Sequence, residues 1–284
     1  MIVSIMRIGI LHPGQMGFMV ALSAVNSGHQ TYWASQNRSP ATSRRATEAG
    51  LLDAGSIQDL CATCDAIASV CPPEFAESTA GQVTGHGFRG LYIDCNAISP
   101  ERARRIGACL TQAGADFVDG GIIGLPTKVR GRTWLYLSGP RAADAAACFS
   151  AGPIETELLG DEPGRASALK MCFAAWTKGS TALLCAILGS AQRLGVIEEL
   201  KRQWARNGPS WEDTAGHIER AAPKAWRWAP EMREIAETFA SAGMPPGFHE
   251  GAAEIYSRLA DFKDTPDIEI ASLLARLAGP AQFR

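Results

Sequence analysis

The chain has 284 residues, of which 46% are hydrophobic and 20% are charged, and this composition is typical of a folded globular protein rather than a disordered one. A formal net charge of −2 disfavours a nucleic-acid-binding protein, because such proteins usually carry a basic excess. The longest apolar stretch, Ala182–Gly189, is too short to cross a membrane, and Met1–Leu11 is interrupted by Arg7, unlike a signal peptide. Eight cysteines without such a signal favour free thiols in a reducing compartment, and we therefore expect a cytoplasmic protein.

Short apolar runs alternate with helical patterns over the first half of the chain. The patterns predict strands at Ile5–Leu11, Thr31–Ala34, Ala66–Cys71, Leu91–Asp94 and Asp116–Asp119, with helices between them at Gln15–Ser27, Pro40–Ala49, Glu74–Gly85 and Pro100–Ala113. Two further strands, Trp134–Ser138 and Ile154–Leu158, flank a helix at Arg141–Phe149. Strands separated by helices indicate a parallel sheet built from βαβ units.

The second half of the chain has a different pattern. From Pro163 to Leu194 apolar residues recur at helical spacing, which predicts one helix of about thirty residues with a possible interruption at Gly179. The remainder is predicted to be helical, with breaks at Gly208–Pro209, Ala229–Pro230 and Met244–Gly247. We therefore predict an α/β domain over residues 1–160 and an all-helical domain over residues 161–284, joined by the long helix.

A glycine-containing turn follows the first predicted strand. Its residues are His12, Pro13, Gly14, Gln15, Met16 and Gly17. Gly14 and Gly17 match the second and third glycines of the dinucleotide-binding fingerprint G-x-G-x-x-G, and His12 occupies the position of the first. The second glycine admits the pyrophosphate, the third lets the helix pack closely on the strand, and the helix N-terminus faces the phosphates. The turn predicts a Rossmann domain that binds a dinucleotide, with His12 more suited to shaping the turn than to catalysis.

The segment after the second predicted strand indicates which dinucleotide binds. No acidic residue occurs from Thr31 to Ala46, although an NAD site usually has one there to bind the ribose 2′-hydroxyl. The loop instead offers Ser35, Asn37 and Arg38. A guanidinium suits a 2′-phosphate because its planar fork can bind two phosphate oxygens. We therefore expect NADP(H) as the cofactor with Arg38 as the main phosphate ligand, whereas Arg44 and Arg45 on the next helix are more typical of plain surface.

Four segments in order resemble the β-hydroxyacid dehydrogenases of the wider 6-phosphogluconate dehydrogenase-like superfamily. They are Ile8–Gly17, Asp94–Pro100 (similar to D-x-S-T-x-S-P), Phe117–Gly124 (similar to F-x-D-A-P-V-S-G) and Gly164–Lys170 (similar to the start of G-x-x-x-x-x-K-x-x-N-N). The Asn37–Ser39 loop also resembles that of NADP-dependent members. The helical tail is similar to a poorly characterised subgroup often labelled phosphogluconate dehydrogenase, a label that we treat as a fold assignment only.

The resemblance implies an NAD(P)-dependent oxidoreductase whose general acid or base is a lysine on the long helix, and Lys170 falls on that position. Reduction of a carbonyl leaves an alkoxide that needs a proton and a nearby positive charge, and a lysine in a cleft can supply both. Two asparagines that follow the lysine in the family are replaced here by Phe173 and Ala174. We expect Thr177 or Lys178, one turn further along the helix, to replace the missing amide in substrate binding.

Two further segments are expected to contact ligands by the same resemblance. Asn96 replaces a family serine and is expected to bind both substrate and cofactor. Cys71 and Pro72 are expected beside the nicotinamide. The other expected substrate-binding residues are Gly121, Ile122, Ile123 and Gly124, where Ile123 replaces a serine that holds the substrate carboxylate in the family. This loss favours a bulkier or more apolar substrate, unless Arg130 and Arg132 hold an anion instead of lying on a surface loop.

Several other features have competing interpretations. Four tryptophans at 204, 211, 226 and 228 indicate the core of a homodimer, as the family resemblance implies, or else a wall of the substrate pocket. His249 is expected to be capping or exposed rather than in the cleft. The pair Cys61 and Cys64 lacks a second pair or a nearby histidine, and no cluster has the spacing of a metal site, so we expect no bound metal.

The leading hypothesis is an NADP-dependent oxidoreductase that moves hydride between nicotinamide and a carbonyl or alcohol carbon of a small organic acid or related metabolite. An NADPH-dependent imine reductase is the first alternative, because the superfamily contains such enzymes and the lost asparagines suit a less polar substrate. A nucleotide-binding pseudoenzyme is the second, suggested by the missing first glycine and the missing asparagines. We expect no nucleic-acid or membrane partner.

Overall fold

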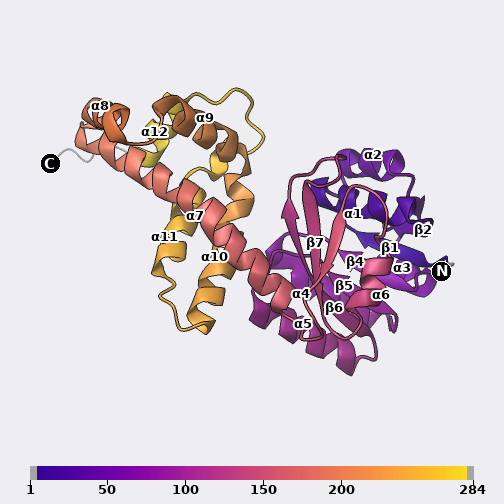
Figure 1. Ribbon diagram of the computed structural model, residues 1–284. Coiled ribbons are helices and arrows are strands. Elements are labelled where there is room, and N and C mark those ends of the chain that lie inside the picture. The colour runs from indigo at the N-terminus through magenta and orange to yellow at the C-terminus, as the bar shows by residue number, and fades with distance from the viewer. Residues whose placement is uncertain (1–4, 280–284) are drawn as a thin grey trace. The chain divides into compact units, whose positions relative to one another are not determined.

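The structure is a computed structural model that describes residues 5–279 (Figure 1). In this part of the chain, eight strands form one sheet in the order β3-β2-β1-β4-β5-β6-β7-β8. Their bounds are β1 (Arg7–Leu11), β2 (Gln30–Trp33), β3 (Leu52–Asp53), β4 (Ala66–Ser69), β5 (Leu91–Asp94), β6 (Asp116–Gly124), β7 (Thr133–Ser138) and β8 (Glu155–Leu158). The first six are parallel, whereas β7 is antiparallel to β6. The predicted Rossmann architecture is confirmed.

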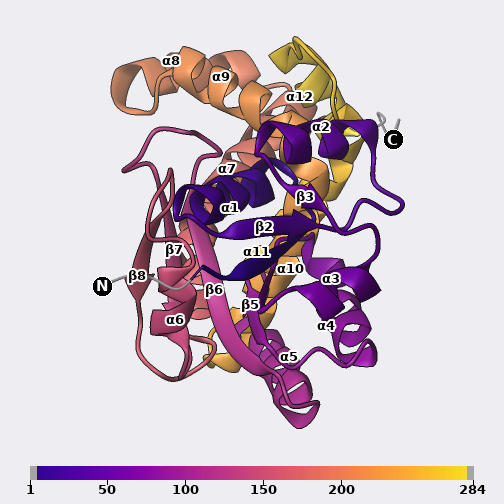
Figure 2. The same cartoon turned by 90° about the vertical axis from the view of Figure 1, so that its right-hand side faces the viewer.

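Helices cover both faces of the sheet (Figure 2). They are α1 (Gln15–Asn26), α2 (Pro40–Glu48), α3 (Ile57–Thr63), α4 (Ala76–Gly85), α5 (Pro100–Gln112) and α6 (Ala142–Ala147), with a 3₁₀ turn at Pro73–Phe75. On β5, Leu91 and Ile93 pack into the core with α1 and α6, while Tyr92 points into the core beneath α3, α4 and α5. Because both faces are covered, β5 is buried throughout and appears in the sequence as an apolar run rather than as an alternating pattern.

Some elements differ from the sequence-based expectation. The two-residue strand β3 and the helix α3 were not predicted, since the first is too short to show periodicity and the second has only seven residues. A capping box between Ser56 and Asp59 starts α3. Strand β6 continues past the predicted end at Asp119 to Gly124, because its second half pairs with β7. The predicted strand at Ala66–Cys71 ends two residues early, at Ser69.

The second half is helical throughout its described residues, as predicted. It consists of α7 (Arg165–Leu194), α8 (Ile197–Asn207), α9 (Trp211–Ala221), α10 (Ala225–Ser241), α11 (Gly247–Arg258) and α12 (Ile270–Ala278), with 3₁₀ turns at Ala222–Lys224 and Ala260–Phe262. The expected break at Ala229–Pro230 is wrong, since α10 continues through Pro230. No interruption occurs at Gly179, where a Cβ would lie 3.2 Å from the Phe248 ring, so this glycine serves close helix packing.

The chain divides into two compact units, and the boundary lies inside α7, between Met171 and Cys172. The predicted boundary at residue 160 falls just after β8. The first unit extends further because the first turns of α7 pack against the sheet, as described below. By length and composition alone, α7 could cross a membrane, a property that the core helix of a water-soluble protein can share.

Candidate dinucleotide-binding and active site

The candidate site lies at the carboxyl edge of the parallel strands. Leu11, Ser69, Asp94 and Asp119 are successive partners across β1, β4, β5 and β6, so the segments that follow them leave the sheet side by side. The chain order reverses between β1 and β4. Ligands of open α/β sheets bind outside the carboxyl ends of the strands at such a switch point. The sheet therefore brings the loops after β1, β2, β4 and β5 to one edge.

The loop between β1 and α1 has the conformation of a phosphate-binding turn. His12 has a φ of 66°, a left-handed conformation that glycine usually supplies, so the turn survives the loss of the first fingerprint glycine. A Cβ on Gly17 would lie 2.4 Å from the His12 carbonyl oxygen, so the close approach of α1 requires this glycine. A Cβ on Gly14 would meet only that oxygen, at 4.0 Å, which leaves open space at the N-terminus of α1. Packing within the chain therefore does not require glycine at position 14. A pyrophosphate that approaches the backbone here would require it.

The two glycines are expected to respond differently to alanine. Gly17→Ala should destabilise the fold by about 1–3 kcal/mol, because its Cβ collides with backbone. Gly14→Ala should leave the thermal midpoint within a few degrees of wild type and weaken dinucleotide binding about tenfold or more, because the methyl group enters the space for the pyrophosphate. Thermal unfolding and fluorescence titration distinguish the two effects. Equal loss of stability in both variants would contradict this assignment.

The loop between β2 and α2 carries the predicted 2′-phosphate ligands. Ser35 and Arg38 close it through a backbone hydrogen bond of 3.2 Å, and Asn37 adopts a φ of 60°. Ser39 caps α2 by accepting from the Thr42 N–H, so the turn and the helix start fix the position of Arg38. Ser35 and Arg38 are half-buried, while Asn37 is exposed.

Arg38 and His12, which come from different loops, lie close together. The guanidinium is near enough to help lower the pKa of His12, which falls to about 4 mainly because the imidazole is desolvated. His12 Nδ1 and Arg38 Nε are buried and have no hydrogen-bond partner among the described residues. Buried polar atoms without partners are uncommon in proteins and call for an explanation such as a ligand. An anion at this position would satisfy two donors, so the residues present fit the 2′-phosphate of NADP(H).

The loops after β4 and β5 are tied together by Asn96. Its Oδ1 accepts from the Cys71 N–H at 2.6 Å and its Nδ2 donates to Ser69 Oγ at 3.3 Å. Asn96 is 2% exposed, so the amide holds the Cys71–Pro72 loop at the sheet edge. Burial raises the pKa of the Cys71 thiol to about 12, which keeps it neutral. The side chain thus positions the loop expected beside the nicotinamide.

Burial also raises the pKa of Asp94, at the end of β5, to about 7, and neighbouring Asp119 adds to the rise. Asp94 Oδ1 accepts from the Asn96 N–H at 2.9 Å. In the sequence, Asp94 stands out only as the first residue of the Asp94–Pro100 motif. The raised pKa is a property of the folded sheet, because it arises mainly from burial and then from Asp119, a neighbour that is distant in sequence.

The first turns of α7 are fixed to β6 by a buried carboxylate. Asp119 accepts from Gly164 N and Ser167 N at 3.0 and 2.9 Å, from Ser167 Oγ at 2.6 Å and from Ser138 Oγ at 3.0 Å. A carboxylate at the N-terminus of a helix also interacts favourably with the helix dipole. The sequence did not reveal this role, because the donors lie 19 to 48 residues away.

The anchored helix brings Lys170 against β6. A Cβ on Gly121 would lie 2.6 Å from the Ala166 carbonyl oxygen and 3.1 Å from Lys170 Cβ, so only glycine allows α7 to approach the strand here. Lys170 is half-buried. Ile122 and Ile123 are buried next to Gly121, and Gly124 ends the strand with a φ of 136°. The structure thus brings together Lys170 and the β6 segment that the sequence assigned to the substrate.

Thr177 and Lys178 belong to the second compact unit. Thr177 Oγ1 donates to the Phe173 carbonyl in its own helix at 3.3 Å. Lys178 forms an ion pair with Glu231 of α10, and its side chain is only 13% exposed, so it is not a surface lysine. Its backbone carbonyl accepts from the Tyr256 hydroxyl at 2.6 Å. The substrate-binding role of these two residues stays a prediction.

The other arginines considered as anion ligands are exposed or half-buried. Arg130 and Arg132 are exposed, and Arg130 Nε lies 3.5 Å from Glu155 Oε1. Arg44 is exposed and Arg45 is half-buried near the end of α2. These positions fit the surface interpretation, and an anion-binding role for Arg130 or Arg132 stays a prediction.

Several aromatic residues after residue 203 pack against neighbours in their own chain. The four tryptophans are half-buried; Trp211 and Trp226 lie beneath the ammonium groups of Lys201 and Lys263, and Trp228 contacts Tyr256 edge-on. The expectation of a capping or exposed His249 is wrong. It is 5% exposed and contacts the rings of Phe239 and Phe248, because α11 begins at Gly247 and places it on the packed face of the first turn.

Cys61 and Cys64 are buried free thiols whose pKa values burial raises to about 11 and about 12. Such thiols are poor nucleophiles. Between residues 5 and 279, no three histidine, cysteine, aspartate or glutamate side chains form a group that could hold a metal ion.

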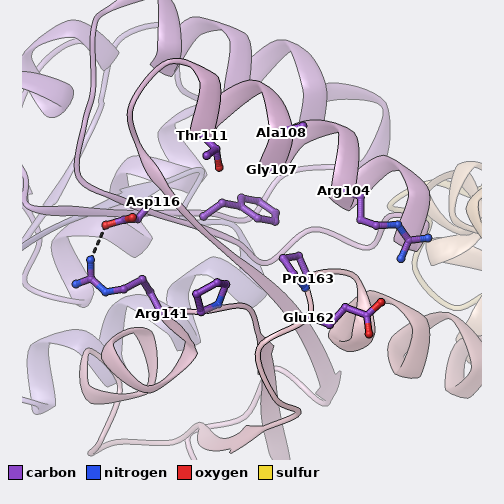
Figure 3. A pocket seen from close by; sticks show the side chains of 10 residues that line it. Arg104, Gly107, Ala108, Thr111, Asp116, Arg141, Glu162 and Pro163 are labelled. Atoms are coloured by element: carbon purple, nitrogen blue, oxygen red, sulfur yellow. Dashed lines mark hydrogen bonds and ion pairs between the residues drawn. The ribbon is translucent and has the colours of Figure 1, made fainter.

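A separate pocket of about 340 Å³ lies elsewhere on the first unit (Figure 3). It is lined by α5 residues including Arg104 and Gly107, by Asp116 and Phe117 at the start of β6, and by Arg141 and Pro163. Figure 3 shows the ion pair between Arg141 and Asp116 at its rim. Because Asp116 is the first residue of β6, the pocket opens at the amino edge of this strand, away from the dinucleotide loop. It is distinct from the candidate active site.

Family models match both halves of the chain. The NAD binding domain of 6-phosphogluconate dehydrogenase matches residues 7–148, half of the chain, and a domain of unknown function, DUF1932, matches residues 191–259. A curated relative, an uncharacterized 28.5 kDa protein of Methanothermus fervidus, is 28% identical over 165 residues, which are 58% of this chain and 63% of that protein. The match thus spans less than two thirds of that relative.

Solved structures resemble the chain over almost its whole length. The conserved protein MTH1747 of unknown function, described as structurally similar to 3-hydroxyacid dehydrogenases, is 26% identical with a TM-score of 0.64, covering 95% of this chain and 99% of its own. Mycobacterium tuberculosis 3-hydroxyisobutyrate dehydrogenase with L-serine is 17% identical with a TM-score of 0.67, at 95% and 98% coverage. An imine reductase from Myxococcus stipitatus with NAD⁺ is 17% identical with a TM-score of 0.55, at 97% and 100% coverage. Likeness at 17% identity shows the fold alone.

The fold, the dinucleotide loop and the matching family models agree on an NAD(P)-dependent oxidoreductase. The chain belongs to the β-hydroxyacid dehydrogenase family of the 6-phosphogluconate dehydrogenase-like superfamily.

Proposed function

We propose that the protein is an NADP-dependent oxidoreductase that acts on a carbonyl or alcohol carbon of a small organic acid or related metabolite, with Lys170 as the general acid or base. The observation that carries the proposal is the close approach of α7 to β6, where Lys170 Cβ lies 3.1 Å from the position of a Cβ on Gly121. This contact holds the only lysine of the first turns of α7 beside the carboxyl edge of the sheet, where a dinucleotide binds.

The proposed chemistry divides between the cofactor and the chain. When bound, the nicotinamide supplies or accepts a hydride at the substrate carbon. Lys170 donates a proton to the oxygen of a reduced carbonyl, or removes it from an alcohol in the reverse direction, and its positive charge stabilises the developing alkoxide. Asp119 keeps the helix in place, and Asn96 holds the Cys71–Pro72 loop on the nicotinamide side.

The preference for NADP(H) is supported by Arg38 and by the absence of an acidic residue on its loop. Charge-assisted hydrogen bonds contribute about 1.5–3 kcal/mol. We therefore expect Arg38→Ala to weaken NADPH binding about 10- to 100-fold and to leave NADH binding within about twofold. Arg44→Ala, an exposed arginine on the next helix, is the matched control and should leave both affinities unchanged. Unchanged NADPH affinity in Arg38→Ala would contradict the proposed cofactor preference.

The substrate side of the site is proposed to be less polar than in a typical hydroxyacid dehydrogenase. Ile122 and Ile123 are buried and apolar, and Phe173 and Ala174 occupy the family's asparagine positions. Imine reduction is therefore the second candidate activity, and imine reductases share this fold. Steady-state assays with NADPH on small keto acids, apolar ketones and cyclic imines distinguish the two. NADPH binding without turnover on any of these classes would favour the nucleotide-binding pseudoenzyme.

We also propose a homodimer that buries an apolar stripe on α7. The exposed apolar side chains recur at intervals of four, three, seven, four and seven residues, which keeps them on one face of the helix as in a helix–helix seam: Leu169, Phe173, Trp176, Leu183, Ile187 and Leu194. Trp176 is 73% exposed, an unusual state for so large an apolar side chain. This stripe is a stronger candidate for the interface than the half-buried tryptophans after residue 203, of which Trp211, Trp226 and Trp228 already contact side chains of their own chain.

The dimer proposal predicts that Trp176→Glu shifts the protein to monomer. A carboxylate in the centre of an apolar seam loses its hydration, so the dissociation constant should rise about 100-fold or more. Sedimentation velocity measures the change. Leu125→Glu, at another residue that is 64% exposed, is the control and should leave the state unchanged. A Trp176→Glu variant that sediments like wild type would contradict the proposed interface.

We further propose that the enzyme works in the cytoplasm, where its free cysteines stay reduced.

A further inference from the structure

We infer that His12 is a specificity-determining residue that binds the 2′-phosphate of NADP(H) together with Arg38, and that its imidazole takes up a proton when this phosphate binds. The inference deepens the proposed function and rests on it. It assigns a role to the residue that replaces the first fingerprint glycine.

The backbone of His12 has a conformation that glycine usually supplies. It has a φ of 66°, a conformation in which a Cβ is unfavourable, and the turn it forms is closed by the Gly14 N–H donating to the His12 carbonyl at 2.7 Å. Glycine would form the same turn without strain. A side chain that is retained despite this cost indicates a gain elsewhere, and strained residues of this kind cluster at ligand sites.

The surroundings of His12 are suited to an anion. His12 Nδ1 and Arg38 Nε are both buried without a hydrogen-bond partner in the described residues. Desolvation lowers the pKa of the Arg38 guanidinium as well as that of His12, so both cationic forms are disfavoured until a negative group arrives. The 2′-phosphate supplies up to two negative charges and three acceptor oxygens. Beside the end of β2, where dinucleotide sites bind the adenine ribose, it would lie between the two side chains.

The charged and titratable groups around the pair determine the direction of the pH effect. Arg38, on the loop after β2, lowers the pKa of His12, while the Leu11 carbonyl of β1 raises it by a smaller amount. A thiolate at Cys71, on the loop after β4, would raise the pKa of Arg38. Burial raises the pKa of this thiol to about 12, so the thiol stays neutral. With a pKa of about 4, free His12 is neutral near pH 7. A bound phosphate dianion raises the pKa of an adjacent imidazole, so binding near neutral pH takes up a proton.

The uptake of a proton on binding determines how NADP⁺ affinity depends on pH. Proton uptake on binding means that NADP⁺ affinity increases as pH falls, by at most about tenfold per pH unit, between the bound-state pKa of His12 and its free value. Protonation of the phosphate itself, with a pKa of about 6, acts in the opposite direction, because the monoanion binds more weakly. NAD⁺ has no 2′-phosphate and should show neither effect.

The test is isothermal titration of the full-length protein with NADP⁺ and NAD⁺ at about pH 6.5 and about pH 8, in two buffers of different ionisation enthalpy. The variants are His12→Asn and Arg38→Ala. Asparagine tolerates the left-handed conformation and keeps a polar side chain, but it does not titrate. Thermal unfolding of each variant without ligand checks that the loop still folds.

For wild type we expect about 3- to 10-fold tighter NADP⁺ binding at the lower pH, with net proton uptake. For His12→Asn, the NADP⁺ affinity should change by less than about twofold between the two pH values, and binding should take up no proton. The NAD⁺ affinity of this variant should equal that of wild type. The same pH dependence in wild type and His12→Asn, or wild-type binding without proton uptake, would overturn the inference. Arg38→Ala separates failure of the His12 inference from failure of the proposed cofactor preference. If this variant keeps the wild-type preference for NADP⁺ over NAD⁺, the proposed cofactor preference fails as well.

Discussion

Replacing Lys170 with alanine is expected to lower kcat by about 10²- to 10⁴-fold while NADPH affinity stays within about twofold of wild type. Proton transfer by a positioned side chain contributes rate enhancements of this size, and Lys170 is the side chain that α7 brings against the Gly121 segment. Cofactor affinity should survive, because the fingerprint turn and the Arg38 loop are formed by residues outside α7. Single-turnover kinetics with NADPH separates the chemical step from binding.

Two controls make the Lys170 result specific. Lys170→Arg keeps the positive charge and side-chain length, but a guanidinium does not release a proton near neutral pH, so activity should stay at least about 100-fold below wild type. Lys128→Ala removes an exposed lysine whose ammonium pairs with Glu48, and kcat should not change. A Lys170→Ala variant that binds NADPH and turns over at the wild-type rate would exclude the proposed acid–base role.

Asp119→Ala is expected to destabilise the protein by about 3–5 kcal/mol, because it leaves buried donors on Ser138, Gly164 and Ser167 without an acceptor. It also removes the negative charge from the N-terminus of α7. Urea unfolding, with the slope compared between variants, measures the loss. Because the same contacts hold the helix that carries Lys170, kcat should fall as well under conditions where the variant is folded.

A neighbouring aspartate provides the matched control for stability. Asp116 begins the same strand, but it is half exposed and pairs with Arg141 at the surface. Exposed ion pairs contribute about 0–1 kcal/mol, so Asp116→Ala should change the free energy of unfolding by less than about 1 kcal/mol. If Asp116→Ala and Asp119→Ala are equally destabilised, or neither is, the anchoring role of Asp119 is wrong.

The features that could be predicted from sequence are local ones. The dinucleotide turn combines a strand, two glycines and a helix start within a short segment, and its steric requirement at Gly17 arises from residues five positions apart or fewer. The helix starts at Pro40 and Pro100 follow serines that cap them, a pattern visible in the sequence itself. The long α7 was predicted because its apolar residues keep helical spacing throughout.

The features that were missed depend on distant partners. The four donors of Asp119 come from β7, from the turn before α7 and from α7 itself, and no spacing in the sequence connects them. The ion pair between Lys178 and Glu231 joins residues 53 positions apart. The burial of His249 is not visible in the sequence, because its neighbours Phe239 and Gly179 lie on other helices. Proximity of His12 to Arg38 likewise requires the β1–β2 pairing of the folded sheet.

We propose above all that the edge of this sheet binds a 2′-phosphorylated dinucleotide for hydride transfer. The most direct test of this proposal is a parallel titration of the wild-type protein with NADPH and NADH, followed by tryptophan fluorescence; Trp33, at the end of β2, lies beside the expected adenosine site. We expect saturable NADPH binding at least about tenfold tighter than NADH binding, the difference expected from charge-assisted contacts to the phosphate. Equal or tighter binding of NADH, or no binding of either dinucleotide, would contradict it.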